Sequence, residues 1–155
     1  MESLNFQNFK CDQLGYVYKD IEKAAQSMKN HLGISNFIIF PPTPHKMIYK
    51  GKPSRMIGKL AVANLFNLQI ELIQCVEGAC VYKDFIEQGN EGLHHIRFGC
   101  DDLSIIIEKM KEEGYEVLQQ GRIVTISYAY FDTIKDFGII IEFASIKRRG
   151  KGKKK

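Results

Sequence analysis

Apolar and polar residues alternate in two short stretches of this chain, and each stretch is followed by an amphipathic segment. The first stretch is residues 11–18, with Gln13 and Val17 on one face and Leu14 and Tyr16 on the other. Such alternation is typical of a half-buried β-strand. The second stretch, which contains His95, lies 82 positions later and has the same pattern.

The segment after the first strand is predicted to be helical. Asp20 is a suitable N-terminal cap, and Gly33 stands where a left-handed C-terminal cap belongs. Further strand candidates are residues 36–40, 46–50, 56–66 and 69–74, and residues 79–89 are predicted to form a short linking helix. We interpret the first half of the chain as β-α-β-β-β.

The second half repeats this order more compactly. The predicted elements are a strand at 94–100, a helix at 103–113, and strands at 115–119, 123–131 and 138–144. Asp101 or Asp102 caps the helix, and Gly114 ends it. Turns are expected at Gly121 and around Lys135 and Asp136.

Two such βαβββ modules predict an α+β fold. A curved eight-stranded mixed sheet would surround a shared cleft, with the helices packed outside. We expect a single domain at residues 1–145, with module one at about 11–76, the linking helix at about 79–89 and module two at about 93–145. Residues 146–155 are expected to form a disordered basic tail.

Polar residues interrupt the apolar pattern at matching points of the two halves: Gln13, Glu71, His95 and Glu142. Glu71 and Glu142 each lie within an apolar late strand, where an unpaired buried carboxylate is costly to desolvate. By alternation all four side chains can face one side of the sheet. Their oxygen donors and single nitrogen suit a six-coordinate divalent ion with open positions. The pattern predicts a metal site between the halves, without distinguishing zinc, nickel, cobalt, manganese or magnesium.

Each of these residues also has a simpler interpretation. Gln13 alone can be a solvated or hydrogen-bonded side chain, and a lone glutamate on an open sheet face is usually exposed. His94 and His95 are adjacent, so alternation puts their rings on opposite faces and makes one of them structural or exposed. His31 and His45 belong to no pattern and are expected at the surface.

The net charge of +4 is unevenly distributed along the 155 residues. The last nine residues carry seven of the 22 basic side chains, and the remaining 15 basic and 18 acidic side chains give −3. A Gly/Lys tail of this kind could touch nucleic acid or anionic lipid, or simply be solubilising. No aromatic residue is interleaved with its charges, so nucleic acid is not an expected partner.

The composition is that of a globular protein, with 45% apolar and 26% charged residues. No apolar run approaches the roughly 20 residues of a membrane-spanning helix, and no secretory signal is expected at the start. The four cysteines, Cys11, Cys75, Cys80 and Cys100, form no CxxC pair and no zinc-ribbon spacing. Reduced thiols and a cytoplasmic location are therefore expected.

Two further features could contribute to binding. Basic residues flank the loop at 51–54, namely His45, Lys46, Lys50, Lys52 and Arg55. They could hold the phosphates or carboxylates of a large thiol cofactor, or form an ordinary solvated loop. Tyr128 and Tyr130 could line the cleft or pack in the core.

Several segments together resemble the vicinal oxygen chelate superfamily. They are QLGYVYKD from Gln13, QIELIQ from Gln69, GLHHI from Gly92 and GIIIEF from Gly138. That superfamily includes glyoxalase I (lactoylglutathione lyase), methylmalonyl-CoA epimerase, extradiol dioxygenases and bleomycin-resistance proteins. The resemblance covers about residues 11–145. It implies His95 as a ligand beside Glu71 and Glu142, and a homodimer.

The chain departs from both enzymes that it resembles most. Gln13 stands where the epimerase has a histidine, and the resulting ligand set resembles that of the lyase. Yet Val17 and Cys75 stand where the lyase has an arginine and an asparagine for glutathione. Residues 54–59 contain no carboxylate to match a second catalytic glutamate of the epimerase.

The resemblance implies metal-dependent proton transfer next to a carbonyl or thioester through a metal-stabilised enolate, as in a lyase or isomerase. Glu142 or Glu71 would carry the proton, and we favour Glu142 as the base with Gln13 as a neutral ligand. The substrate would be a small molecule, such as a thioester or thiol conjugate. The alternative is a non-catalytic small-molecule-binding protein of the bleomycin-resistance type.

Overall fold

The computed structural model describes residues 4–146, which form two halves of similar element order. After a short 3-10 helix (Phe6–Asn8), the first half contains β1 (Cys11–Val17), α1 (Ile21–Leu32), β2 (Ile38–Ile39), β3 (Thr43–Tyr49), β4 (Lys52–Leu65) and β5 (Leu68–Gly78). Helix α2 (Val81–Glu87) links it to the second half. That half contains β6 (Gly92–Gly99), α3 (Leu103–Glu112), β7 (Val117–Ile123), β8 (Ile126–Phe131), α4 (Ile134–Phe137) and β9 (Ile140–Ile146).

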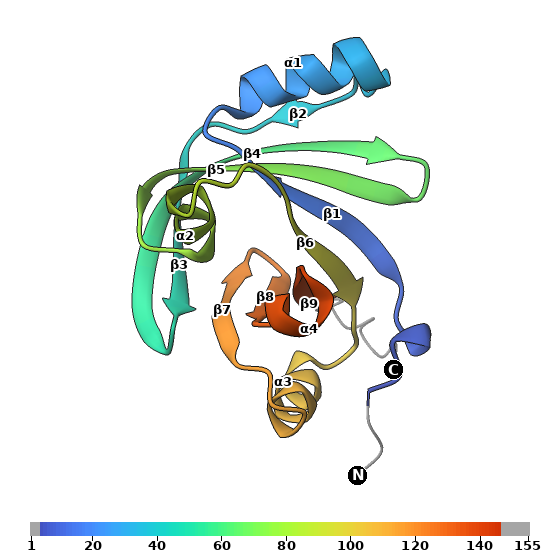
Figure 1. Ribbon diagram of the computed structural model, residues 1–155, viewed down its shortest axis with the longest axis vertical. Helices are drawn as coiled ribbons and strands as arrows, with labels where there is room; N and C mark the ends of the chain where they lie inside the picture. The colour runs from blue at the N-terminus through green and yellow to red at the C-terminus, as the bar shows by residue number, and fades with distance from the viewer. Residues whose placement is uncertain (1–3, 147–155) are drawn as a thin grey trace, which may run out of the picture.

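Eight of the strands form a closed ring (Figure 1). The order is β4-β3-β7-β8-β9-β6-β1-β5, and β5 pairs again with β4. Strand β1 is parallel to β5, and β6 is parallel to β9, whereas the other pairs are antiparallel. The predicted eight-stranded mixed sheet is confirmed, with the two-residue β2 added beside β4 outside the ring.

The ring is completed where the halves meet for the second time, between β3 and β7. Three residue pairs make this seam: Met47 with Gly121, Ile48 with Gln120, and Tyr49 with Gln119. The first junction between the halves, β1 with β6, is longer. A closed ring has no free sheet edge among its eight strands, and its inner face is shared by both halves, as expected from the sequence.

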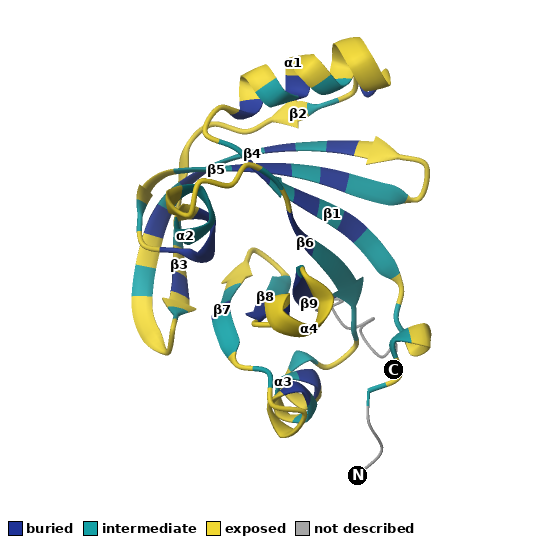
Figure 2. Ribbon diagram, viewed as in Figure 1, coloured by how far each residue is buried: buried dark blue, intermediate teal, exposed yellow. Residues whose placement is uncertain are grey.

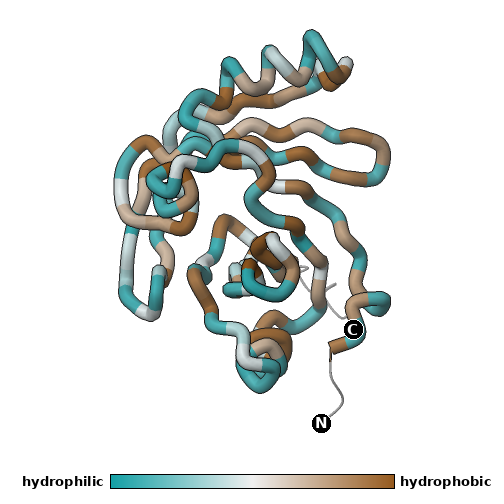
Figure 3. The backbone as a smooth tube through the Cα atoms, in the orientation of Figure 1, coloured by the Kyte–Doolittle hydropathy of each residue, from teal (hydrophilic) through white to brown (hydrophobic). Residues whose placement is uncertain are grey.

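The helices α1 and α3 cover outer faces of the sheet. Helix α1 packs on β4 and β5, and α3 packs on β8 and β9. Their buried residues face the strands while their exposed residues face outward (Figure 2). The same division is visible in the hydropathy of the chain (Figure 3). Helix α2 packs on β5 and β1, and its Val81 and Tyr82 join the cluster of residues inside the ring.

The predicted ends of the two long helices are confirmed. Asp20 caps α1 by accepting a hydrogen bond from the Lys23 amide at 3.0 Å, and Gly33 ends the helix with a left-handed φ of 70°. Asp102 is the cap of α3, accepting from the Ser104 amide at 2.9 Å. A carboxylate at these positions satisfies amide groups that have no partner within the helix.

The turn predicted at Gly121 is wrong. Strand β7 runs through this residue to Ile123, and the chain reverses at Val124, which has a φ of 53°. A Cβ atom on residue 121 would lie 2.9 Å from the Tyr128 hydroxyl oxygen. Glycine therefore serves here to admit the tyrosine side chain of the neighbouring strand, a packing role that looks the same as a turn signal in the sequence.

Two sequence predictions concern the remaining parts of the chain. The predicted basic tail lies outside the described residues from residue 147 onward, and its first residue, Ile146, is the last residue of β9. No helix within residues 4–146 is long and apolar enough to cross a membrane.

Candidate functional site

The predicted site residues lie on four neighbouring strands: Gln13 on β1, Glu71 on β5, His95 on β6 and Glu142 on β9. The register of the parallel pairs relates them. Gly15 lies opposite Glu71, and Arg97 lies opposite Glu142. Gln13 comes two residues before Gly15, and His95 comes two residues before Arg97. Gln13 and His95 are therefore equivalent positions of the two halves, as are the two glutamates.

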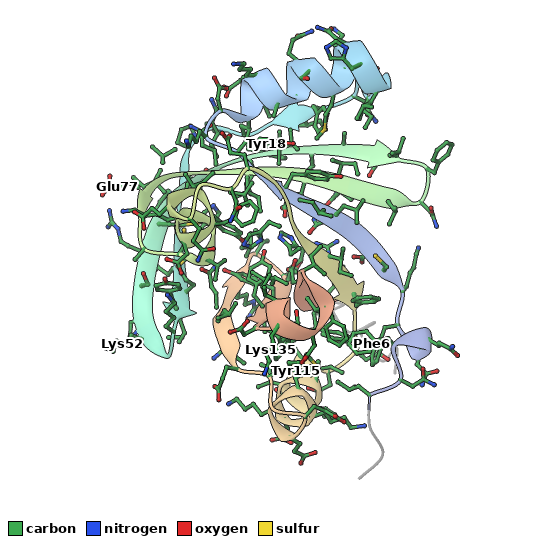
Figure 4. All side chains as sticks on the ribbon, viewed as in Figure 1. Phe6, Tyr18, Lys52, Glu77, Tyr115 and Lys135 are labelled. Atoms are coloured by element: carbon green, nitrogen blue, oxygen red, sulfur yellow. The ribbon has the colours of Figure 1, made fainter. Side chains whose placement is uncertain are left out.

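Three of these side chains converge inside the ring. His95 Nε2 lies 3.2 Å from Glu142 Oε2 and 3.8 Å from Glu71 Oε2. The side chains of His95, Glu142 and Glu71 are 0%, 6% and 17% exposed. Glu71 and Glu142 border a cavity of about 140 Å³, and Figure 4 shows side chains from the surrounding strands filling the centre of the ring.

Gln13 also borders this cavity but is held by other polar side chains. Its amide nitrogen faces Glu71 Oε2 at 3.3 Å, and its amide oxygen faces Arg97 Nη1 at 3.0 Å. This orientation satisfies both groups, because the reverse orientation would set donor against donor and acceptor against acceptor. The amide of Gln69 lies 2.7 Å away on the neighbouring strand. Gln13 thus links the guanidinium of Arg97 to the carboxylate of Glu71.

The prediction that His94 and His95 face opposite ways is wrong. Both rings are buried, and their Nδ1 atoms lie 3.0 Å apart. A register shift between β1 and β6 pairs Gly15 with His95 but Tyr16 with Leu93, so His94 is the extra residue of a β-bulge. The bulge interrupts the alternation and lets His94 support the ring of His95.

Burial sets the protonation of His94. Its ring packs against Tyr82, Phe85 and Tyr130, and desolvation, followed by the nearby His95, holds the pKa of His94 well below its usual value. A neutral His94 donates to or accepts from His95 through Nδ1. When it accepts, His95 carries its hydrogen on Nδ1 and turns the Nε2 lone pair toward the two carboxylates.

Desolvation also affects Glu71. The pKa of this carboxyl is raised to about 7. Burial is the main cause and the charge of Glu142 adds to it, whereas His95 and Arg97 act in the opposite direction. A carboxyl that titrates near neutrality is typical of a site that lacks a full complement of counter-charges.

Tyrosine side chains form the apolar wall of the cavity. Tyr128 and Tyr130 both line it and also belong to the buried core cluster, so both of their predicted roles are confirmed. The hydroxyl of Tyr130 is 2.7 Å from that of Tyr82, and burial raises the pKa of both well above the usual value. These hydroxyls stay protonated at neutral pH and can donate hydrogen bonds.

Gln69, Arg97 and His45 were not predicted as site residues, yet all three line the cavity. The sequence contained a signal for Gln69 and Arg97. Gln69 precedes Glu71 by two residues, and Arg97 follows His95 by two. Strand alternation puts each on the inward face. The expected surface position of His45 is wrong, since it is partly buried and burial lowers its pKa.

The donors fit a divalent cation. His95 Nε2 and Glu142 Oε2 are buried and have no hydrogen-bond partner, although they lie close together. Lone pairs that converge without a hydrogen between them need a cation or a proton. Within residues 4–146, no three His, Cys, Asp or Glu side chains are already spaced as a preformed metal site. The fourth predicted donor is the amide of Gln13.

The basic residues around the loop at 51–54 do not form one cluster. Lys50 pairs with Asp84 on α2 at 2.9 Å. Lys46 and Arg55 instead line an outer hollow at the seam between β3 and β7. Their proposed role in holding a large cofactor remains a prediction.

Residues 12–130 match the sequence profile of the glyoxalase/bleomycin resistance protein/dioxygenase superfamily. The chain belongs to this superfamily. The match includes both strands of the first half that carry site residues and the strand of His95. No curated protein matches the chain significantly.

Solved structures of the superfamily fold are similar to this chain. A hypothetical protein from Bacillus halodurans C-125 has a TM-score of 0.63 and 19% identity, covering 92% of this chain and 97% of its own. Methylmalonyl-CoA epimerase from Mycobacterium tuberculosis has a TM-score of 0.60 and 18% identity, covering 89% and 88%. The Streptomyces coelicolor epimerase, solved with 2-nitronate-propionyl-CoA, gives 0.60 and 18%, covering 89% and 94%. At these identities the likeness concerns the fold.

Proposed function

We propose that this protein is a divalent-metal-dependent enzyme that moves a proton next to a carbonyl or thioester. The observation that carries the proposal is the convergence of His95 Nε2 with the carboxylates of Glu142 and Glu71, two of whose buried atoms lack partners. Gln13 would complete the ligand set if its amide turned, so that the oxygen that now faces Arg97 pointed to the ion. A bound divalent ion would polarise a substrate oxygen and so acidify the neighbouring C–H bond.

Glu142 is the base in this proposal. Its side chain is nearly buried, and its unpartnered Oε2 faces the cavity that the substrate would enter. A carboxylate within reach of the acidified C–H bond can remove its proton. Return of the proton to the adjacent carbon gives isomerisation, and return to the opposite face gives epimerisation.

Arg97 and the tyrosines would supply the remaining interactions. Arg97 is fixed by an ion pair with Asp12 at 2.8 Å, and it fixes the amide oxygen of Gln13 in turn. Its charge lies where negative charge on a substrate carboxylate or carbonyl oxygen would be stabilised. The hydroxyl of Tyr130, on the strand next to that of Glu142, offers a neutral donor.

The size of the cavity restricts the substrate. A volume of about 140 Å³ admits only a small reacting group. A larger hollow of about 660 Å³, lined by Lys10, Asp12 and Cys100 among others, shares Arg97 and Ile126 with the cavity. The rest of a thioester or thiol conjugate would lie in this outer hollow, with its carbonyl entering past Arg97.

A specific observation favours the alternative, a non-catalytic binding protein. Arg97 provides a permanent positive charge close to the buried carboxylates, so that the cavity carries part of its counter-charge without any metal. A protein of that kind would bind a small cationic or hydrogen-bonding ligand and would show no metal stoichiometry.

Metal titration separates the two functions. Calorimetry of chelator-treated protein with nickel, zinc, cobalt, manganese and magnesium should give one site per chain, and His95→Gln should lose binding by at least about 100-fold. His31→Gln, on the exposed side of α1, is the matched control. Absence of stoichiometric binding by every metal would exclude the enzyme proposal and favour the binding protein.

An assay panel then tests the chemistry. It should contain the hemithioacetal of methylglyoxal with thiols and methylmalonyl-CoA, each with and without metal. For a substrate that turns over, Glu142→Gln should lower kcat by at least about 100-fold. Full activity of Glu142→Gln with retained metal would assign the base to Glu71.

The proposal includes a homodimer. The short edge strand β2 leaves the apolar side chains of Ile38 and Ile39 61% and 43% exposed. An exposed apolar edge is a favourable place for strand or face contacts with a second copy. Light scattering on purified protein should give twice the chain mass, and Ile38→Lys should restore the single-chain mass if this edge is the contact.

A further inference from the structure

Two cysteines lie in contact at the point where β5 leads into α2. Cys75 is near the end of β5, and Cys80 comes immediately before the first residue of α2. Their sulfur atoms are 3.3 Å apart. Of the four residues between them, Val76, Glu77 and Gly78 still belong to β5, whose pairing with β4 shifts between Cys75 and Glu77. Gly78 has a φ of 104° and is packed against the backbone of Arg55. This backbone holds the two thiols together.

We propose that Cys75 and Cys80 are a redox-active pair that forms a reversible disulfide by exchange with a low-molecular-weight disulfide. Cys75 is the attacking thiol and Cys80 is the resolving thiol. This activity is separate from the metal-dependent chemistry proposed above and requires neither the metal nor a substrate.

The two sulfur atoms differ in exposure, as thiol–disulfide exchange requires of an attacking and a resolving thiol. Cys80 is fully buried, whereas Cys75 is partly exposed in a hollow of about 270 Å³ outside the ring cavity. Lys19 and Lys83 line this hollow with Tyr18 and Glu77, and the last two are labelled in Figure 4. The lysines can receive the carboxylates of a peptide-like disulfide such as glutathione disulfide.

The same contact activates Cys75. The hydrogen bond from Cys80 lowers the pKa of Cys75 to about 7, with help from the charge of Lys83, and raises the pKa of Cys80. In contrast, desolvation raises the pKa of Cys100 to about 11 and raises that of Cys11 as well. Since the thiolate is the nucleophile, Cys75 is the reactive thiol of the described residues at neutral pH.

The exchange balances in two steps. The Cys75 thiolate attacks one sulfur of the small disulfide, which forms a mixed disulfide and releases one small thiolate. Cys80 then loses its proton, attacks Sγ of Cys75 and releases the second small thiolate, which takes up that proton. Counted from the two thiols, the protein gives up two electrons and two protons, one proton when Cys75 ionises and one from Cys80, and the small disulfide becomes two small thiols. A small thiol reverses both steps.

Closure of this bridge would reach the ring cavity through α2. Tyr82 follows Cys80 by two residues, lines the cavity and shares a hydrogen bond with Tyr130. A bond between the sulfurs ties the start of α2 to β5 and so holds Tyr82 in the cavity wall. The position of Tyr82 in the cavity wall would therefore depend on whether the pair is a disulfide or two thiols.

The primary test uses the unaltered full chain with glutathione disulfide as the probe. After incubation, alkylation of remaining thiols and cleavage at Glu77, the peptides of Cys75 and Cys80 should remain joined without a reducing agent. Dithiothreitol should separate them. In untreated protein, Cys75 should be alkylated at least about tenfold faster than Cys100 at neutral pH.

Two serine variants assign the order of attack. Cys80→Ser should accumulate a glutathione adduct on Cys75, because no resolving thiol is present. Cys75→Ser should give no adduct on the buried Cys80. Equal alkylation rates of Cys75 and Cys100, or a stable mixed disulfide on Cys75 in the unaltered chain without a link to Cys80, would overturn the proposal. The measurements on the unaltered chain decide even if a variant folds poorly.

Discussion

The imidazole of His95 occupies the space in which a side chain of Gly15 would lie. A Cβ atom on residue 15 would be 1.9 Å from Cε1 of His95, and the two residues are paired across β1 and β6. The absence of a side chain at Gly15 in one half therefore makes room for His95, the predicted nitrogen ligand of the other half, to turn inward. This relationship is one-sided, because the position equivalent to Gly15 in the second half is Arg97.

Gly15→Ala should displace the ring of His95. The methyl group overlaps the ring, so we expect a loss of stability of about 1–3 kcal/mol and a loss of metal affinity of at least about tenfold. Urea denaturation and metal calorimetry measure the two effects. Gly99→Ala is the matched control, since a Cβ there would have its nearest contact at 3.6 Å from Asp12. Equal stability and equal metal affinity of the two variants would show that the ring of His95 has room to move.

Arg97→Met should strengthen metal binding while weakening the fold. The substitution removes a positive charge near Glu142 and Glu71, so divalent affinity should rise by about tenfold. It also breaks the ion pair with Asp12 and leaves the oxygen of Gln13 without a donor, which should cost about 1–3 kcal/mol of stability. Calorimetry with Arg122→Met as a surface control measures the first effect. Weaker metal binding by Arg97→Met would mean that orientation of Gln13 outweighs charge repulsion.

Metal-free protein should lose stability as the pH rises from about 4.5 to about 7. Glu71 has a folded-state pKa raised from 4.5 to about 7, so in this window the folded protein holds a proton that the unfolded chain has released. The titration of Glu71 therefore lowers the free energy of unfolding as the pH rises, by on the order of 3 kcal/mol at most. Denaturant titrations between these pH values measure it.

Two controls isolate the contribution of Glu71. Glu71→Gln should flatten the pH dependence, because the amide does not titrate. A saturating divalent ion should flatten it as well, since the ion stabilises the carboxylate in the folded state. An unchanged slope in Glu71→Gln would assign the pH dependence to other groups.

Thr133→Val should destabilise the second half without changing the cavity. The buried hydroxyl of Thr133 donates to the carbonyl of Ile139 at 2.6 Å and accepts from the amide of Ile141 at 3.0 Å. Valine leaves both backbone groups unpaired, at a cost of about 1–3 kcal/mol. Thr43→Val, whose hydroxyl contacts an exposed carbonyl, should change urea stability by less than about 0.5 kcal/mol.

Strand alternation and capping residues predicted much of this structure. The inward faces of the strands follow directly from the period of two, and that is why Gln13, Glu71, His95 and Glu142 were found together. Their roles as ligands remain predictions. The position of His94 depends on a bulge, and a bulge depends on how two distant strands align. The sequence pattern of neither strand alone predicts that alignment.

The missed neighbours have a different cause. Arg97 was predictable from alternation, yet a charged residue on a strand is normally solvated, and only the closed ring makes it internal. His45 lies on β3, which becomes an inner wall when β3 meets β7. The seam consists of three residue pairs whose members lie 70 to 74 positions apart in the sequence, and the hydrophobic pattern of neither strand specifies its partner.

This seam has a consequence for how the molecule unfolds. Each half taken alone would expose two strand edges, one at β1 or β6 and one at β3 or β7, because both junctions join different halves. Melting of either half removes backbone partners from both edges of the other. The two repeats are therefore expected to lose their structure together, in a single cooperative transition, even though each carries a complete set of strands and a helix of its own.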